Sequence, residues 1–218
     1  MTSASDRLIG DLVEDLEPVR RQPRLRQAFA IVLTFWAALL GVVLWSEKGE
    51  VGVVSIFADR IYLASFFGLL VAALGGTVSA LAAGVPGRER LEVGGTLLSL
   101  VGLLAAALAC VIGIGMHGLP ATPSPHGADM MCFQTGAFLS LLPAGVIFSF
   151  LVRGWAGHPV RASMIALLAS GALGGLIVHA SCGFMAPRHL LIGHLSVPIV
   201  LVVLGVYPLA VLLRRVRG

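Results

Sequence analysis

Six long apolar runs, separated by short polar segments, dominate the sequence. They lie near residues 29–45, 61–83, 93–116, 133–152, 162–180 and 190–213. The hydrocarbon core of a bilayer is about 30 Å thick, and a helix needs roughly 20 apolar residues to cross it. Open strands are excluded from that core because their backbone groups would lack hydrogen-bond partners. The sequence therefore predicts an all-α, polytopic membrane protein with six transmembrane helices.

Composition supports the same class of protein. Hydrophobic residues make up 57% of the 218 and charged residues only 12%, with a mean hydropathy of +0.96, which is more apolar surface than a soluble domain can bury. The net charge of +4 indicates topology rather than direct nucleic-acid binding, because most arginines flank the apolar runs. The runs contain no Asp, Glu, Lys or Arg, which argues against proton-coupled transport and ion conduction.

The basic residues predict the orientation of the helices. Twelve lie on the side that holds both termini and only three on the other side, namely Lys48, Arg60 and Arg188. Positively charged flanks stay in the cytoplasm. We therefore expect both termini to be cytoplasmic, in a bacterial inner membrane. The polar start does not resemble a signal peptide, so the first run is expected to remain as an anchor.

Residues 1–28 form a predicted cytoplasmic segment with an amphipathic helix over about residues 6–17, ended by Pro18. Five acids and one arginine give this helix a charge of −4, so anionic lipid would repel it. Its apolar stripe is expected to bind a protein partner or the basic loops of this same chain, and both remain open. The expected partner-binding residues are Leu8, Leu12, Val13, Asp15 and Leu16. Residues 29–213 form the predicted bundle, and 214–218 a basic tail.

Two cysteines share one depth on the predicted outer side. Cys132 opens the fourth run and Cys182 follows the fifth, so a disulfide can form if those helices pack together; otherwise both are independent small residues. Cys110, inside the third run, is expected to be a packing residue.

Histidines gather on the same predicted outer side. They are His117, His126, His179, His189 and His194. His179 precedes Cys182 by three residues, which places both on one helix face, and imidazole and thiolate suit soft or borderline metals. The possible metal ligands are therefore His179, Cys182 and Cys132. The alternative is that interfacial histidines bond only to water or backbone.

No catalytic arrangement is visible. The sequence has no CxxC pair of the kind that a membrane thiol oxidoreductase uses. It also shows no nucleophile and base in register and no convincing phosphate-binding glycine loop. We therefore expect no enzyme and no resident cofactor.

The pattern as a whole resembles the NrsF-like membrane anti-sigma factors. The stretches that carry the resemblance are "DLVEDLEPVRR" (11–21), "LSLLP" (139–143) after Cys132, and "HASCG" (179–183). The resemblance implies a regulator that holds an extracytoplasmic-function (ECF) sigma factor at the inner membrane and releases it under heavy-metal or oxidative stress. It also implies that Cys132 and Cys182 are the sensing cysteines. The alternative function is a small membrane transporter or metal-handling permease, indicated by the outer histidines.

Overall fold

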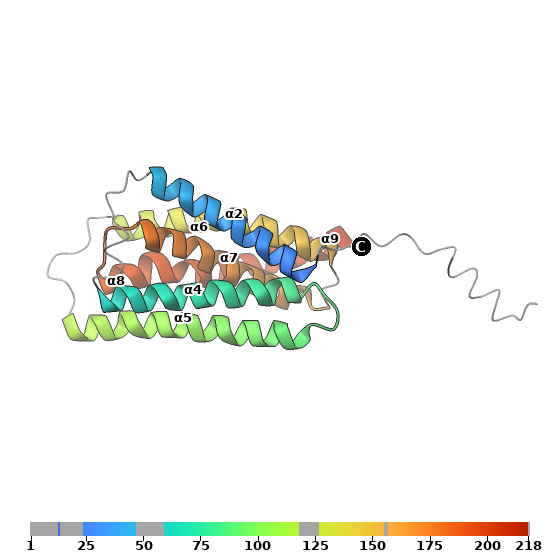
Figure 1. Ribbon diagram of the computed structural model, residues 1–218, viewed down its shortest axis with the longest axis horizontal. Helices are drawn as coiled ribbons and strands as arrows, with labels where there is room; N and C mark the ends of the chain where they lie inside the picture. Colours follow the sequence, from blue (N-terminus) through green and yellow to red (C-terminus); the bar gives the residue numbers. More distant parts are fainter. Residues whose placement is uncertain (1–12, 14–23, 47–58, 118–126, 155–156, 218) are drawn as a thin grey trace, which may run out of the picture.

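The computed structural model describes residues 13, 24–46, 59–117, 127–154 and 157–217, and these residues form helices joined by short connections (Figure 1). The helices are α2 (Leu25–Ser46), α4 (Arg60–Ala82), α5 (Glu89–His117), α6 (Ala128–Arg153), α7 (Pro159–Ser181), and a last continuous run made of α8 (Pro187–His189), the π-helix η1 (Leu190–Leu195) and α9 (Ser196–Arg217).

The prediction of an all-α protein with six membrane-spanning helices is confirmed for the described residues. Six helical stretches of 22 to 30 residues are long and apolar enough to cross a membrane. Each predicted run coincides with one of them, although the second run includes Ala83, one residue past the end of α4. The helices otherwise extend past the predicted ends by up to five residues. The extensions carry polar and charged residues such as Glu89 and Asp129. A prediction from hydropathy ends a span before such residues, whereas the helix itself continues through them into the membrane interface.

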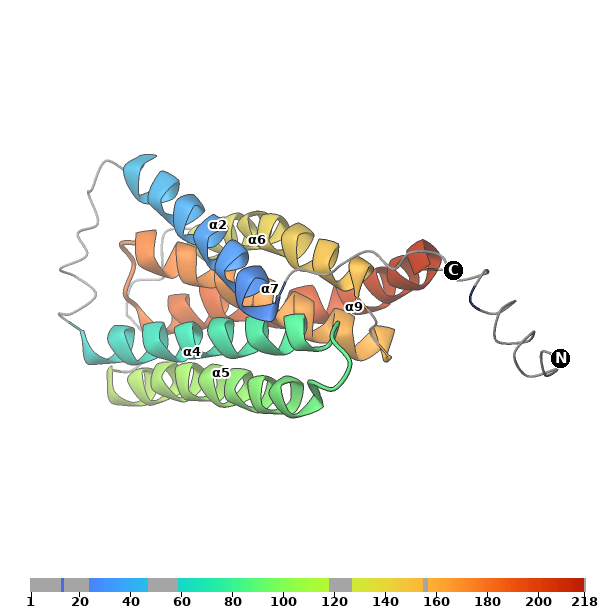
Figure 2. The ribbon, with the colours of Figure 1, turned by 45° about the vertical axis from the view of Figure 1, so that its right-hand side comes forward.

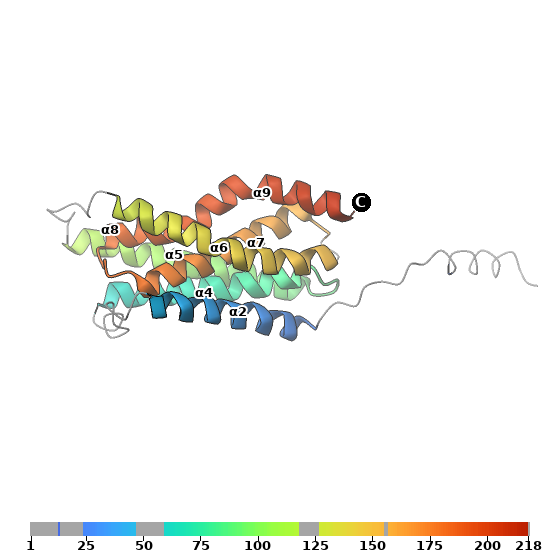
Figure 3. The same ribbon diagram turned by 90° about the horizontal axis from the view of Figure 1, so that it is seen from above.

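Helix α7 is the centre of the bundle. In its most apolar stretch 89% of the residues are buried, against 11% in α2. Figures 1 and 3 show α7 surrounded by the other helices. A central helix in contact with several neighbours is well placed to pass a change at one end of the bundle to the rest.

Helices α4 and α5 form a tightly packed antiparallel pair (Figure 2). A Cβ added at Gly102 would lie 2.5 Å from the backbone nitrogen of Ala72 and 2.6 Å from the carbonyl oxygen of Gly68. The Ser99 hydroxyl also donates to the Ala72 carbonyl across this contact, at 2.8 Å. Small residues drive helix association in lipid because they let backbones approach closely. The outer face of α5 exposes large apolar side chains such as Leu104, as expected for contact with lipid.

Helix α2 crosses α7 on another side of the bundle (Figure 2). The indole Nε1 of Trp36 donates a hydrogen bond of 3.0 Å to the Leu173 carbonyl. Since the hydrocarbon core offers no water, this bond both satisfies the indole and fixes the two helices against each other.

The start of α2 and the end of α9 lie at the same end of the bundle (Figure 3). The cytoplasmic location of that end stays a prediction from the arginine distribution. The predicted amphipathic helix at 6–17 lies outside the described residues apart from Val13, whose backbone is helical and whose side chain is exposed. Leu8, Leu12, Asp15 and Leu16 therefore have no structural description.

Candidate functional site

Cys132 and Cys182 meet at the end of the bundle opposite the start of α2 and the end of α9 (Figure 3). Cys132 lies in the second turn of α6, and Cys182 directly follows the last residue of α7. Their sulfur atoms are 3.7 Å apart and hydrogen-bonded, and no disulfide joins them. The helices can come this close because Gly174 of α7 has no side chain. A Cβ at this position would collide with the Gly136 carbonyl of α6. The predicted proximity of the two cysteines is therefore present, without a disulfide bond.

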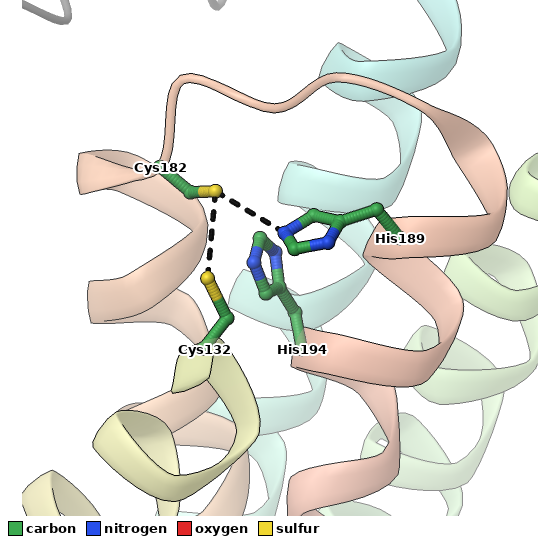
Figure 4. Close-up of side chains that lie close together, drawn as sticks. All are labelled: Cys132, Cys182, His189 and His194. Atoms are coloured by element: carbon green, nitrogen blue, oxygen red, sulfur yellow. Dashed lines mark hydrogen bonds between the residues drawn. The ribbon is translucent and has the colours of Figure 1, made fainter. Parts of the chain in front are cut away.

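Two histidines of the last span face these thiols (Figure 4). Nε2 of His189 lies 3.3 Å from Sγ of Cys182, and the His194 ring lies beside both sulfurs. One ligand atom from each of the four residues lies within 4.8 Å of all the others. His189 and His194 are almost fully buried, at 1% and 0% exposure.

A π-helix brings His189 and His194 onto one side of the span. Residues five apart are about 140° apart around an α-helix, so they would point in different directions. The π-helix η1 follows His189 and includes His194. Because the hydrogen bonds of a π-helix join residues five apart, His189 and His194 lie nearly above one another on the same side of the span. Pro198 contributes, because it has no N–H to donate to the carbonyl of His194 four positions earlier.

Asp129 orients the His189 ring. Its Oδ1 atom lies 2.5 Å from Nδ1 of His189. Asp129 precedes Cys132 by three residues on α6, so one helical turn supplies both the carboxylate and the thiol. The carboxylate leaves Nε2 of His189 as the nitrogen that faces Cys182.

His179 is directed away from the thiols, toward α4 and the last span. Its Nδ1 lies 3.0 Å from Nδ1 of His194, and its Nε2 lies 3.2 Å from the Ser65 hydroxyl and 3.3 Å from the Tyr62 carbonyl. Of the three possible ligands named from the sequence, the structure thus places Cys132 and Cys182 in the four-residue cluster. His179 lies behind His194 instead.

The surroundings of Cys182 favour its thiolate form. The hydrogen bond with the Cys132 thiol lowers the pKa of Cys182, burial opposes this, and the hydrogen bond with His189 adds to the lowering. A thiolate is the form of cysteine that attacks oxidants and binds metal ions. Two thiols and two imidazoles within reach of each other suit soft and borderline metals, and the thiols can also be oxidised to a disulfide.

The remaining candidates lie elsewhere. Cys110 is fully buried in α5, packed in a cluster with Leu69 and Ala106, in line with a packing role. His158 directly precedes α7, at the opposite end of the molecule. His126 and the side chain of His117 lie outside the described residues.

Comparison with known protein families decides the class of this protein. A family model described as "Negative regulator of sigma F" (NrsF) matches residues 12–214, nearly the whole chain. The chain belongs to the NrsF family. Membership in the NrsF family makes it a negative regulator of a sigma factor, with a sigma factor as its partner. No curated protein and no solved structure gives a significant match.

For this NrsF-family chain, sequence reasoning missed Asp129, and it named His189 and His194 among the outer histidines without singling them out as neighbours of the thiols. Asp129 lies before the predicted start of the fourth span, and the five-residue spacing of His189 and His194 gives no α-helical pattern. The stretch that could have indicated the two histidines is "HLLIGHLSVP" (189–198), in which both precede a proline inside an apolar span.

Proposed function

We propose that this protein holds an ECF sigma factor at the bacterial inner membrane and releases it when heavy metals or oxidants react with Cys132 and Cys182. The observation that carries the proposal is the contact between the two sulfurs, 3.7 Å apart, in a chain of the family of sigma-factor regulators. Metals would be captured by the thiols. A two-electron oxidant such as a peroxide would take two electrons and two protons from the pair and leave a disulfide.

The sensing end and the sigma-binding end lie on opposite sides of the membrane in this proposal. The arginine distribution predicts cytoplasmic termini, and with that orientation the cysteines face the periplasm. A change at Cys182 acts directly on the end of α7, the buried central helix. A shift of α7 and α6 would alter the cytoplasmic surface that the N-terminal segment and loops present to sigma.

The stripe of Leu8, Leu12, Val13 and Leu16 is the proposed sigma-binding element, with Asp15 among its acidic flanks. A short helix of this kind is marginal alone in water and orders when its apolar stripe enters a groove on a partner. The acidic flanks would favour a basic surface and speed its capture.

The decisive experiment measures co-purification of an ECF sigma factor of the same organism with the full-length protein in detergent. Leu12→Glu and Leu16→Glu are each expected to weaken binding at least tenfold, equivalent to about 1.4 kcal/mol. Ser5→Glu adds the same charge outside the stripe and is the matched control, expected to bind normally. Unchanged binding of both Leu variants would remove the N-terminal helix from the mechanism.

A further inference from the structure

The orientations of the two buried histidines in the cluster follow from their hydrogen bonds. A carboxylate only accepts, so Nδ1 of His189, which faces Asp129 at 2.5 Å, carries a proton. In the neutral ring the lone pair is then on Nε2, the nitrogen that faces Cys182. Asp129 thus turns a metal-binding nitrogen toward the thiols.

His179 orients the ring of His194 in a similar way, through a hydrogen bond between their Nδ1 atoms. The Tyr62 carbonyl only accepts, and the Ser65 hydroxyl itself donates to that carbonyl at 2.9 Å, so Nε2 of His179 is the donor to both. Nδ1 of the neutral His179 ring must then accept, and Nδ1 of His194 donates to it. This leaves the lone pair of His194 on Nε2.

Nε2 of His194 has no hydrogen-bond partner. It is one of two buried side-chain nitrogen or oxygen atoms in the described part of the chain that lack one, and the side chain is 0% exposed. A buried polar atom without a partner is costly unless something binds it. Figure 4 shows the ring edge that carries this atom facing the two cysteine sulfurs.

The distances fit a tetrahedral metal ion. With bonds of about 2.3 Å to sulfur and about 2.0 Å to nitrogen, a tetrahedral ion holds its ligand atoms roughly 3.3 to 3.8 Å apart. Two of the six pairs match this range: the two sulfurs are 3.7 Å apart, and Cys182 Sγ is 3.3 Å from His189 Nε2. The other pairs lie within 4.8 Å, so an ion would draw the outermost ligands slightly inward. Two thiolates also cancel the charge of a divalent ion, which suits a buried site.

We propose that Cys132 Sγ, Cys182 Sγ, His189 Nε2 and His194 Nε2 form a closed four-ligand site for one divalent ion of the zinc group, Zn²⁺ or Cd²⁺, with Asp129 and His179 as positioning residues. Binding displaces two protons, that of the Cys132 thiol and the one shared between Cys182 and His189, and breaks no other covalent bond. The ion joins the start of α6, the end of α7 and the π-helix of the last span. This inference specifies the ligand of the proposed sensor, and its regulatory meaning rests on the proposed function.

The test uses the full-length protein in detergent, reduced and stripped of metal with a chelator, and titrated with Co²⁺ as a spectroscopic probe. We expect one Co²⁺ per chain with the intense visible bands of a tetrahedral ion and a thiolate charge-transfer band, both abolished by one equivalent of Zn²⁺. Cys132→Ser, Cys182→Ser, His189→Ala and His194→Ala should each change this spectrum and weaken binding at least tenfold. Cys110→Ser and His158→Ala are the matched controls and should bind like the parent protein.

Two results would overturn the site. One is a folded, reduced parent protein, judged by circular dichroism and gel filtration, that gives neither tetrahedral Co²⁺ bands nor a Cd²⁺–thiolate absorption. The other is an unchanged spectrum and affinity in His189→Ala and His194→Ala, which would leave the histidines outside the coordination sphere. Sigma-factor binding is measured on the same preparations. Since the proposed function has metal release sigma, sigma capture is scored on the metal-free form. Metal binding by a protein whose metal-free form captures no sigma would refute the proposed function alone, whereas sigma capture without metal binding would refute the site alone.

Discussion

Tyr62 of α4 and His179 of α7 contact each other in three ways. The Tyr62 hydroxyl donates to the His179 carbonyl, the rings stack with centroids 4.2 Å apart, and the Tyr62 carbonyl lies 3.3 Å from His179 Nε2. Since α7 ends at Ser181, the His179 carbonyl is one of the last four, which have no partner within the helix. Tyr62 supplies that partner and connects the cluster to α4.

Replacing Tyr62 by Phe should destabilise the bundle. The substitution keeps the ring stack but leaves a buried carbonyl without its donor, which costs about 1 to 3 kcal/mol. Thermal unfolding in detergent measures the effect. The chain has only one other tyrosine, Tyr207, whose side chain is 74% exposed, so Tyr207→Phe is the control and should unfold like the parent. Equal melting temperatures for both variants would contradict the capping role of Tyr62.

Enlarging Gly102 should disrupt the contact between α4 and α5. A Cβ at this position meets the backbone of Ala72 and Gly68, and backbone cannot move aside as a side chain can, so Gly102→Ala should cost about 1 to 3 kcal/mol. Gly94 lies on the same helix with nothing within 4 Å of its Cβ position. Gly94→Ala should therefore be neutral or stabilising, by up to about 1 kcal/mol from helix propensity. The melting temperatures of the two variants should move in opposite directions or differ by several degrees.

Removing the Asp129 carboxylate should weaken metal binding without changing the ligands. Residues that orient a metal-binding histidine typically contribute 10- to 100-fold to affinity, so Asp129→Ala should bind Co²⁺ about that much more weakly, and Asp129→Asn, which keeps an acceptor oxygen, should recover part of the loss. The saturated variants should keep the parent visible spectrum. Affinity within twofold of the parent for Asp129→Ala would show that the carboxylate does not position His189.

The response to stress should depend on two of the three cysteines. Cys132→Ser and Cys182→Ser are each expected to abolish the induction of sigma-dependent transcription by cadmium, because each removes one thiolate from the cluster. Cys110 is buried away from the cluster, so Cys110→Ser should respond normally. A transcriptional reporter in cells measures this, with membrane levels of each variant checked by immunoblot. Equal loss in all three variants, at normal protein levels, would contradict a specific sensing role.

The six spans and the position of the cysteines could be predicted from the sequence alone. Crossing a bilayer is a requirement on length and composition, and both are readable without any knowledge of packing. The order of the helices then places Cys132 and Cys182 at one end. That both thiols touch depends on Gly136 and Gly174, whose lack of side chains lets α6 and α7 meet.

Which histidines face the thiols was decided only by tertiary structure. On an α-helix His179 and Cys182 share a face while His189 and His194 do not, so α-helical periodicity favoured His179 as a neighbour of the thiols. The structure places His189 and His194 beside the thiols (Figure 4). The structure has a π-helix at 190–195, next to Pro198 and packed on α7, where a Cβ at Gly175 would lie 2.8 Å from the His194 carbonyl oxygen. The sequence determined the spans because the bilayer acts on each segment separately, whereas the cluster required a backbone conformation that depends on contacts between segments.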